Sequence, residues 1–286
     1  MIPNESKTQK TNEIRVELHA LDLAHKDVSE NLKRMRASLE SQGAQRASDP
    51  RPTLALFPEL TLTGFVTDQP SAVACERTSK SVQDAVKLAQ EFGVALGFGF
   101  VEYVAGQIKP QNTYWVVNER GELLGDYQKI HLFTGGAPSE AMTYRPGQQA
   151  CVLEWQGWKF GLGICFDLRF PMLWETYAHA EVDGLILPAC WLGGESKSAQ
   201  LKALASGLAV SSRAYFLATN RSGSDPVAHY EGDLLAIAPS AQVLLETRCE
   251  VSSVASVVLS AESLARSRKI KVDRAHERTL YEIKSR

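Results

Sequence analysis

The sequence predicts a single α/β domain built of stacked layers. Segments typical of β-strands alternate along the chain with segments of helical spacing, which is the order found in layered α/β folds. A length of 286 residues, with 44% hydrophobic and 22% charged residues, suits a large buried core. No internal repeat, low-complexity tract or Pro/Gly/Ser-rich linker divides the chain. We therefore expect a disordered tail over residues 1–12 and one domain over residues 13–286.

The first part of the chain begins the alternation. The run RVELHALDL, starting at Arg15, predicts a strand, and residues 28–42 predict a helix because Leu32, Met35 and Leu39 recur at helical spacing. The SQGAQRASDPRP stretch ends that helix. Further on we expect the apolar strand TLALFPEL with a turn, a helix over residues 79–92, and the strands VALGFGFVEY and TYWVVNE, the latter ending in a turn at residues 120–121.

The later part continues in the same way. The segment CVLEWQGWKFGLGICF predicts a hairpin around Gln156 and Gly157. The elements expected after it are a helix from Pro171, the buried strand DGLILPACW, a helix over residues 197–213 and the strand YFLATN. These strands are apolar enough that we expect both faces of the sheet layers to be mostly buried.

The amino-acid composition argues against nucleic acid and membranes as binding partners. The net charge of -2 and the pI near 6.3 leave no basic field for nucleic acid or for an anionic membrane surface. The first fifteen residues are polar, and no later run is long enough to span a bilayer. The five cysteines are widely spaced and include no CxxC pair, which favours reduced thiols over disulfides or a zinc site. We expect a cytoplasmic protein with no nucleic-acid or membrane partner.

Chemistry-bearing residues stand at the ends of three predicted strands, and the first is Glu59. It follows the apolar strand in LFPEL, where Pro58 stiffens the chain, so its carboxylate is placed to act as a general base. On this segment alone, a surface glutamate where a strand meets its loop is the simpler interpretation.

The second residue is Lys129, in GDYQKIHLF. Hydrophobic neighbours can keep a lysine dehydrated, and an ammonium whose charge a carboxylate offsets can stabilise an oxyanion or activate a thiol. His131 shares a face with Lys129 in an extended strand, but a lone histidine is more often a hydrogen-bonded structural residue, and we assign it a minor role at most.

The third residue is Cys165, in GLGICFDLRFP. A cysteine at the end of a glycine-containing strand, just before a turn and a helix, can expose its sulfur where backbone N–H groups point inward. Cys75, Cys151 and Cys249 are better explained as small buried hydrophobic residues, and Cys190 is left open between the two interpretations.

Taken together, these segments resemble the nitrilase (carbon–nitrogen hydrolase) superfamily. LFPELTLTGF, GDYQKIHLF and GICFDLRFP occur in the family's order, with Lys129 70 positions after Glu59 and Cys165 36 positions after Lys129. The resemblance also takes in NT at residues 112–113, YRPG at 144–147, the strand ending in LPACW and NRSG at 220–223. The resemblance covers residues 15–240, with a weaker similarity at residues 274–281.

The resemblance implies a fold and a mechanism. The fold is an α-β-β-α sandwich of two mixed sheets, extended across a homodimer or a larger homo-oligomer. The implied catalytic residues are Glu59, Lys129 and Cys165, with Glu140, seven residues before Gly147, as a second glutamate that orients the lysine or the water. Cys165 would attack an amide carbon, and Lys129 with the backbone N–H of Phe166 would hold the oxyanion. No metal or other cofactor is implied.

The resemblance also bears on the substrate. The segments YRPGQQACVLEWQGWKFGLGICFDLRFP and HYEGDLLAI are similar to the ω-amidase branch, whose small-molecule substrates are dicarboxylic acid monoamides such as 2-oxoglutaramate. A distal carboxylate calls for a further cation, and Arg145 and Arg221 are candidates, with Trp191 as a further substrate-binding residue. Deaminated glutathione amidase, N-carbamoyl amidohydrolase, nitrilase and a catalytically silent binding protein stay open as alternatives.

Three departures from the family pattern limit this transfer. The helix before the Asn-Arg strand reads GLAVSS at residues 207–212, without the family's arginine, glutamate and asparagine. Leu234 replaces the serine of the common G-D-S, and Cys190 stands where alanine or asparagine is usual. These differences leave Glu59, Lys129 and Cys165 in place and bear on substrate preference.

Overall fold

The computed structural model describes residues 10–135, 139–226 and 228–269. Residues 1–9 of the expected tail and the weaker similarity at residues 274–281 lie outside the described residues. Residues 10–12 contact the folded domain, although the sequence analysis assigned them to the disordered tail. The Thr11 amide donates to the Gln156 carbonyl at 3.0 Å, and the Trp158 indole N–H donates to the Thr11 carbonyl at 3.1 Å.

The first of two six-stranded sheets has the strand order β14-β1-β2-β3-β4-β5. Strands β1, β2 and β3 are parallel, and β14, β4 and β5 are antiparallel to their neighbours, so the sheet is mixed. Its strands are β1 (Glu13–Ala20), β2 (Thr53–Leu56), β3 (Ala95–Glu102), β4 (Gln111–Val117), β5 (Leu123–Gln128) and β14 (Ser253–Ser260).

The second six-stranded sheet repeats this plan with the order β13-β12-β9-β8-β7-β6. Strands β7, β8 and β9 are parallel, and the outer strands are antiparallel to their neighbours. Its strands are β6 (Cys151–Trp155), β7 (Trp158–Leu162), β8 (Gly184–Ala189), β9 (Tyr215–Asn220), β12 (Leu234–Ile237) and β13 (Val243–Thr247). A separate two-stranded ribbon pairs β10 (Ser222–Ser224) with β11 (His229–Glu231).

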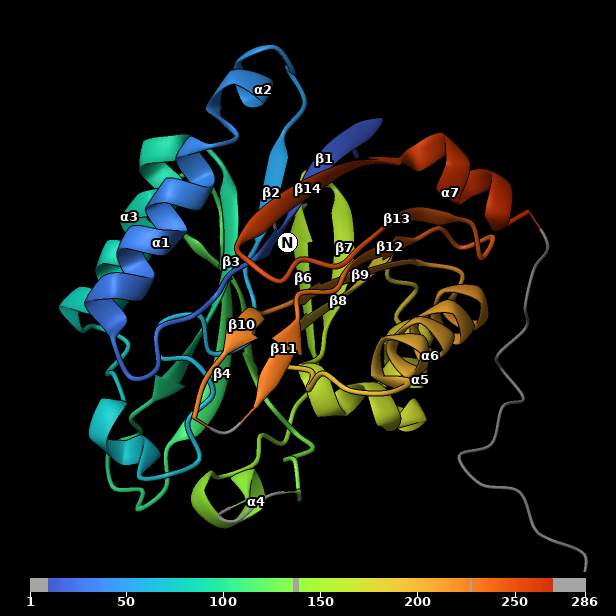
Figure 1. The fold of residues 1–286 in the computed structure, drawn as a ribbon. Helices are drawn as coiled ribbons and strands as arrows, with labels where there is room; N and C mark the ends of the chain where they lie inside the picture. Colours follow the sequence, from blue (N-terminus) through green and yellow to red (C-terminus); the bar gives the residue numbers. More distant parts are fainter. Residues whose placement is uncertain (1–9, 136–138, 227, 270–286) are drawn as a thin grey trace, which may run out of the picture.

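Helices cover the outer faces of the two sheets (Figure 1). Helices α1 (Val28–Glu40) and α3 (Lys80–Phe92) lie outside the first sheet, and α5 (Pro171–His179) and α6 (Lys197–Ser212) lie outside the second. The short helical segments are α2 (Gly43–Ala47), η1 (Pro70–Val73), α4 (Glu140–Thr143), η2 (Cys165–Arg169) and α7 (Ala261–Ser267). This arrangement confirms the predicted α-β-β-α sandwich of two mixed sheets.

Strand alternation explains how one chain fills three layers of core. In β2, Leu54 and Leu56 pack into the cluster between the two sheets, whereas Ala55 and the following Phe57 pack against the helices of the first sheet. Successive side chains of a strand point to opposite faces, so both faces of β2 must be apolar. The predicted burial of the sheets is confirmed for β1 to β4, β8 and β9.

Sequence reasoning missed three outer strands, β5, β13 and β14, and the inner strand β12, whereas the outer strand β6 was expected as part of a hairpin. Strand β13 is only half-buried or exposed along its length, and β14 is buried at one position, so neither carries an apolar run. In β5, a Cβ at Gly125 would lie 2.7 Å from a methyl carbon of Leu153, so a side chain there would require Leu153 to shift. The glycine and the polar residues of β5 do not form the apolar pattern of a strand. Tertiary pairing, more than local preference, makes these segments strands.

A second close approach positions the loop that carries Glu59. A Cβ at Gly99 of β3 would lie 2.4 Å from the Leu60 amide nitrogen, so only glycine lets this loop pass across β3. The Leu62 amide then donates to the Gly99 carbonyl at 3.0 Å, and the Gly99 amide donates to the Thr61 hydroxyl at 3.1 Å. The main chain after β2 is therefore fixed where Glu59 leaves it.

The chain segments near the two ends are joined at one buried carboxylate, Asp183. Its Oδ2 accepts from the Lys10 ammonium at 2.6 Å and from the Lys159 amide at 2.9 Å, and its Oδ1 accepts from the Arg268 guanidinium at 3.0 Å. Arg268 also donates to the carbonyls of Val182 and Arg213. Asp183 thus ties the segments before β1 and after α7 to the second sheet.

We predict that Asp183→Asn lowers the free energy of unfolding by about 2–3 kcal/mol, because Lys10 and Arg268 lose their buried counter-charge and an NH2 donor replaces one acceptor oxygen. Urea unfolding followed by circular dichroism measures the change. The control is Glu246→Gln, which removes the half-exposed pair between Glu246 and Lys202 and should change stability by less than about 1 kcal/mol. Equal losses in the two variants would contradict this prediction.

Candidate active site

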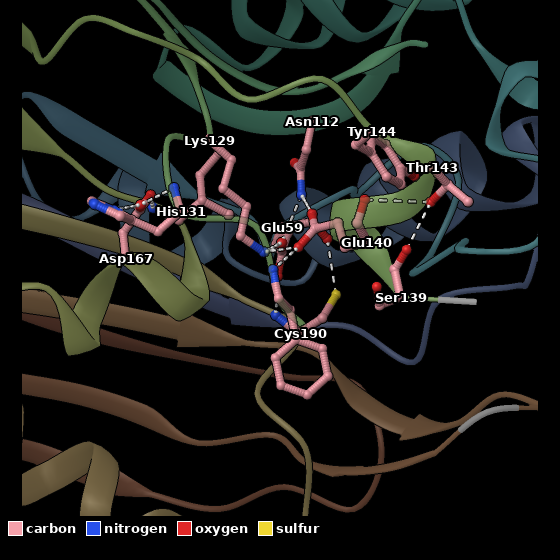
Figure 2. A network of polar contacts seen from close by, with 12 residues as sticks. Glu59, Asn112, Lys129, His131, Ser139, Glu140, Thr143, Tyr144, Asp167 and Cys190 are labelled. Atoms are coloured by element: carbon pink, nitrogen blue, oxygen red, sulfur yellow. Dashed lines mark hydrogen bonds and ion pairs between the residues drawn. The ribbon is translucent and has the colours of Figure 1, made fainter. Parts of the chain in front are cut away.

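The structure brings together the ends of three strands and one short helix. Glu59 follows β2, Lys129 directly follows β5, Cys165 begins η2 after β7, and Glu140 begins α4. Glu59 and Glu140 are completely buried, and Lys129 is 1% exposed. Figure 2 shows Glu59, Lys129 and Glu140 converging on one point between the two sheets.

The Lys129 ammonium lies between two carboxylates. It donates to Glu59 Oε1 at 2.7 Å and to Glu140 Oε2 at 2.7 Å (Figure 2). Its main chain is held as well, since the Gly147 amide donates to the Lys129 carbonyl at 2.8 Å. A Cβ at Gly147 would lie 2.1 Å from the Gln128 carbonyl oxygen, so the glycine of YRPG is required for this contact.

Neutral donors complete the coordination of the carboxylates. Asn112, the second residue of β4, donates through Nδ2 to Glu59 Oε1 at 2.7 Å and to Glu140 Oε1 at 2.8 Å. The Cys190 amide donates to Glu59 Oε2 at 2.7 Å, and the Phe133 amide donates to Glu140 Oε2 at 2.8 Å. Each carboxylate oxygen therefore has at least one donor.

The charges explain the direction of the pKa shifts. Burial lowers the pKa of Lys129, but the attraction of Glu140 and Glu59 outweighs it, and the net pKa lies well above the usual value. Burial raises the pKa of Glu140, and Lys129 offsets this only in part. Lys129 therefore stays an ammonium ion and cannot serve as a base.

Cys165 stands at the start of η2 in a left-handed conformation. Its φ of 46° is unusual for a residue with a side chain and costs about 1–3 kcal/mol. Burial, with a further contribution from Glu59, raises the pKa of its thiol well above the usual range. The resting sulfur is consequently a thiol and needs a base to become a nucleophile.

Asp167 fixes the turn that presents Cys165. Its Oδ2 accepts from the Ile164 amide at 2.8 Å and from the Tyr127 hydroxyl at 2.8 Å, and its Oδ1 accepts from the His131 amide at 2.9 Å. The ring of His131 lies 2.7 Å from the same Oδ1 and stacks on Phe170 with centroids 3.7 Å apart. His131 is thus bound to the turn that displays Cys165.

A pocket opens beside the thiol. Its wall combines the two cysteines and Lys129 with aromatic and aliphatic side chains and two further cations. The lining residues are Phe65, Lys129, Phe133, Cys165, Phe166, Arg169, Cys190, Trp191, Leu192 and Lys197. Trp191 and Phe166, both expected near the substrate, are among them.

The two arginines expected to meet a distal carboxylate are placed elsewhere. Arg221 is fully buried, pairs with Asp225 at 2.7 Å and lies over the ring of Tyr230. The Arg145 amide donates to the Pro110 carbonyl, and within the described part of the chain neither arginine lines the pocket. The structure thus does not bring Arg145 and Arg221 to the pocket, because loop matches give no side-chain direction.

The cations that do line the pocket are Arg169 and Lys197. Arg169, which follows the Cys165 turn, donates to Gln200 at 2.7 Å and lies over the ring of Trp191 at 4.9 Å. Asp167, two residues before Arg169, accepts from other groups, namely the Ile164 amide, the Tyr127 hydroxyl and the His131 amide. Lys197 begins α6, and its ammonium has no ion-pair partner among the residues the structure describes.

Cys190 and Asn112 were not expected to contact the catalytic carboxylates. Cys190 directly follows β8, and its thiol donates to the Glu59 carbonyl at 3.3 Å in addition to its amide contact. Asn112 could have been noticed as a polar residue at the start of an apolar strand that pairs with the strand before Lys129. The altered GLAVSS segment still completes α6.

Among the described residues, no cluster of three His, Cys, Asp or Glu side chains is arranged to hold a metal ion. None of the helices in those same residues is both long and apolar enough to cross a membrane. All five cysteines are free.

Sequence comparison establishes the protein family to which this fold and this site belong. The carbon-nitrogen hydrolase family matches residues 20–269, which include every residue of the site described above. The chain belongs to this family.

Individual relatives agree with that assignment. The chain is 29% identical to omega-amidase NIT3 of Saccharomyces cerevisiae over 191 residues, which are 63% of this chain and 65% of the relative. It is 31% identical to omega-amidase YafV of Escherichia coli K12 over 147 residues, 49% of this chain and 55% of the relative. The aligned regions thus span less than two thirds of these two relatives' own lengths.

A solved structure matches over nearly the whole chain. The crystal structure of Saccharomyces cerevisiae Nit3, a member of branch 10 of the nitrilase superfamily, superposes with a TM-score of 0.82 at 26% identity. The match covers 93% of this chain and 98% of the yeast protein. The two-sheet sandwich is therefore shared from end to end.

Proposed function

We propose that this protein is a cysteine-dependent amidase that hydrolyses the terminal amide of a small dicarboxylic acid monoamide to the acid and ammonia. The observation that carries the proposal is the buried Glu59–Lys129–Glu140 cluster beside the Cys165 thiol in a pocket rimmed by cations. The similarity to two omega-amidases supports the choice of substrate.

In the first half of the reaction, Glu59 takes the proton of the Cys165 thiol as sulfur attacks the amide carbon. The oxyanion is stabilised by the Lys129 ammonium and by the backbone N–H of Phe166. Phe166 is the second residue of η2, where N–H groups lack intrahelical acceptors. Glu59 then passes its proton to the leaving nitrogen, and ammonia departs from a Cys165 thioester.

In the second half, water attacks the thioester carbon while Glu59 again takes a proton. The same donors hold the second oxyanion, and the carbon–sulfur bond breaks to release the acid and restore the thiol. Glu140 positions the Lys129 ammonium and balances its charge. This chemistry uses side chains of the protein and a water molecule, without a cofactor.

Two cations that line the pocket support the proposed substrate class. A dicarboxylic acid monoamide carries a carboxylate away from the scissile bond, and Arg169 and Lys197 are cations in the right place to bind it. Apolar groups such as Phe65 and Leu192 would contact the short carbon chain between the two ends.

Other substrates would use the same residues. Deaminated glutathione, N-carbamoyl amino acids and nitriles also present a carbon that Cys165 could attack, and a silent binding protein would retain the pocket without turnover. Ammonia release measures turnover of dicarboxylate monoamides, N-carbamoyl amino acids and nitriles, and release of a primary amine measures turnover of deaminated glutathione. Cys165→Ala is the blank in both assays, and a silent binding protein would give no turnover in either. Turnover of nitriles or carbamoyl compounds with none on dicarboxylate monoamides would refute the substrate but not the mechanism.

We predict that Cys165→Ala and Cys165→Ser lower kcat by a factor of about 10⁴ or more, because no nucleophile forms the thioester. Glu59→Gln, which keeps the shape of the side chain but removes the base, should lower kcat by about 10²–10⁴. Intact-protein mass spectrometry with iodoacetamide should locate the first adduct on Cys165. A first adduct on Cys190 would contradict the assignment of the nucleophile.

We predict that Lys197→Met raises KM for a dicarboxylate monoamide by about 10-fold or more, since a charge-assisted contact is lost, and leaves KM for an uncharged amide unchanged. Initial rates for the two substrates measure this difference. Lys202→Met is the control on the same helix, because Lys202 pairs with Glu246 away from the pocket. Equal effects of Lys197→Met on both substrates would contradict carboxylate binding at the rim.

We also propose that two copies pair through the helical face formed by α5 and α6. Met172 of α5 is 51% exposed and Val210 of α6 is 47% exposed, which leaves apolar side chains on two helices that pack together. Light scattering at micromolar concentration should give at least twice the chain mass, and Val210→Asp should reduce it. A monomeric mass for the unmodified protein would refute this pairing.

The cytoplasmic location stays a prediction. The five unpaired cysteines support it, since reduced thiols suit a reducing compartment.

A further inference from the structure

Asn112 contacts all three charged residues of the proposed catalytic cluster. Its Nδ2 bridges Glu59 and Glu140 at 2.7 and 2.8 Å, and its backbone carbonyl accepts from the Lys129 amide at 2.9 Å (Figure 2). The side chain is 1% exposed. One side-chain amide group therefore joins two carboxylates that a single ammonium also joins.

The orientation of this amide is determined by charge. Both hydrogens of Nδ2 point at carboxylate oxygens, and the reversed amide would place Oδ1 against them. The Asn112 Oδ1 that results is buried and has no hydrogen-bond partner among the described residues. A buried acceptor without a donor is unfavourable, so the two contacts made by Nδ2 must outweigh its loss.

The cluster needs a second bridging donor because its charges do not balance. Two ionised carboxylates and one ammonium leave a net negative charge in a buried site, and like charges at short range favour protonation of one of them. Lys129 alone satisfies only one oxygen of each carboxylate. Asn112 adds donors without adding charge, and donors to the ionised form of a carboxylate stabilise that form.

We propose that Asn112 is a positioning residue that keeps Glu59 and Glu140 ionised side by side around Lys129, so that Glu59 is free to accept the proton of Cys165. The inference rests on the proposed amidase function, which gives Glu59 its role as base. Without Asn112, the ionised cluster would lose two hydrogen-bond donors, and protonation of Glu140 would become more favourable.

The experiment compares Asn112→Ala, which removes both donors, with Asn112→Ser, which keeps one hydroxyl donor. Neither change removes the backbone carbonyl that binds Lys129. The control is Asn118→Ala at the turn beyond the other end of β4, where Nδ2 donates to Glu122 at 2.6 Å. It also deletes a buried amide that binds a carboxylate, but outside the catalytic cluster.

Two pH profiles are measured for each protein. One is kcat/KM for a dicarboxylate monoamide, and the other is the rate of alkylation of Cys165 by iodoacetamide, located by mass spectrometry. Alkylation requires the thiol to lose its proton but requires no turnover. If the unmodified protein hydrolyses none of the amides, the proposed function fails while the alkylation profile still tests Asn112.

The expected result is a shift of the acidic limb of both profiles. Loss of the donor to Glu140 raises the pKa of that carboxyl, so in Asn112→Ala the rates should begin to rise about one pH unit higher, a tenfold loss on that limb, with nearly full rates at high pH. Asn112→Ser should shift less, and Asn118→Ala should not shift at all.

Three results would overturn the proposal. One is a uniform fall in rate at all pH values with the limb unmoved, which would indicate a purely structural role. Another is an equal shift in Asn118→Ala. The third is loss of folding in both Asn112 variants by circular dichroism, which would assign the residue to the stability of the fold.

Discussion

The site depends on burying a lysine between two glutamates. Breaking such a pair by removing one partner costs about 3–5 kcal/mol, because the remaining charge has neither water nor a counterion. Glu59, Lys129 and Glu140 come from the ends of two strands and from a short helix, so the cluster is complete only when the first sheet and the α4 segment are assembled. The charges that serve the chemistry therefore also constrain the fold around them.

The same burial sets the state of the nucleophile. A sulfur in this environment stays protonated at rest, since burial and the nearby carboxylates disfavour a thiolate. The position of Cys165, rather than a lowered thiol pKa, prepares it for reaction. A left-handed residue at the start of η2 and a turn held by Asp167 present the sulfur beside Glu59 and Lys129. In the proposed mechanism, deprotonation of Cys165 is coupled to attack on the substrate carbon.

The second sheet contributes the two cysteines of the site. It contributes Cys165 after β7 and Cys190 after β8, and the Cys190 amide holds the Glu59 oxygen that Lys129 and Asn112 leave free. The pocket lies where the ends of the two sheets meet, and its rim carries Arg169 and Lys197 from η2 and α6. In the proposed function, the second sheet and its helices thus supply the reacting thiol and both of these cations, and the first sheet supplies Glu59 and Lys129.

The sequence by itself determined the α/β layers and the central strands and helices, because apolar periodicity is a local property of the chain. Its resemblance to the family selected Glu59, Lys129, Cys165 and Glu140 as candidate catalytic residues. Only the tertiary structure decided the edge strands β13 and β14, whose residues become strands by pairing with neighbours. It also placed Asn112 and Cys190 on Glu59 and turned Arg221 toward Asp225, leaving Arg169 and Lys197 at the pocket. Side-chain direction in loops depends on contacts between residues far apart in sequence, which no local pattern records.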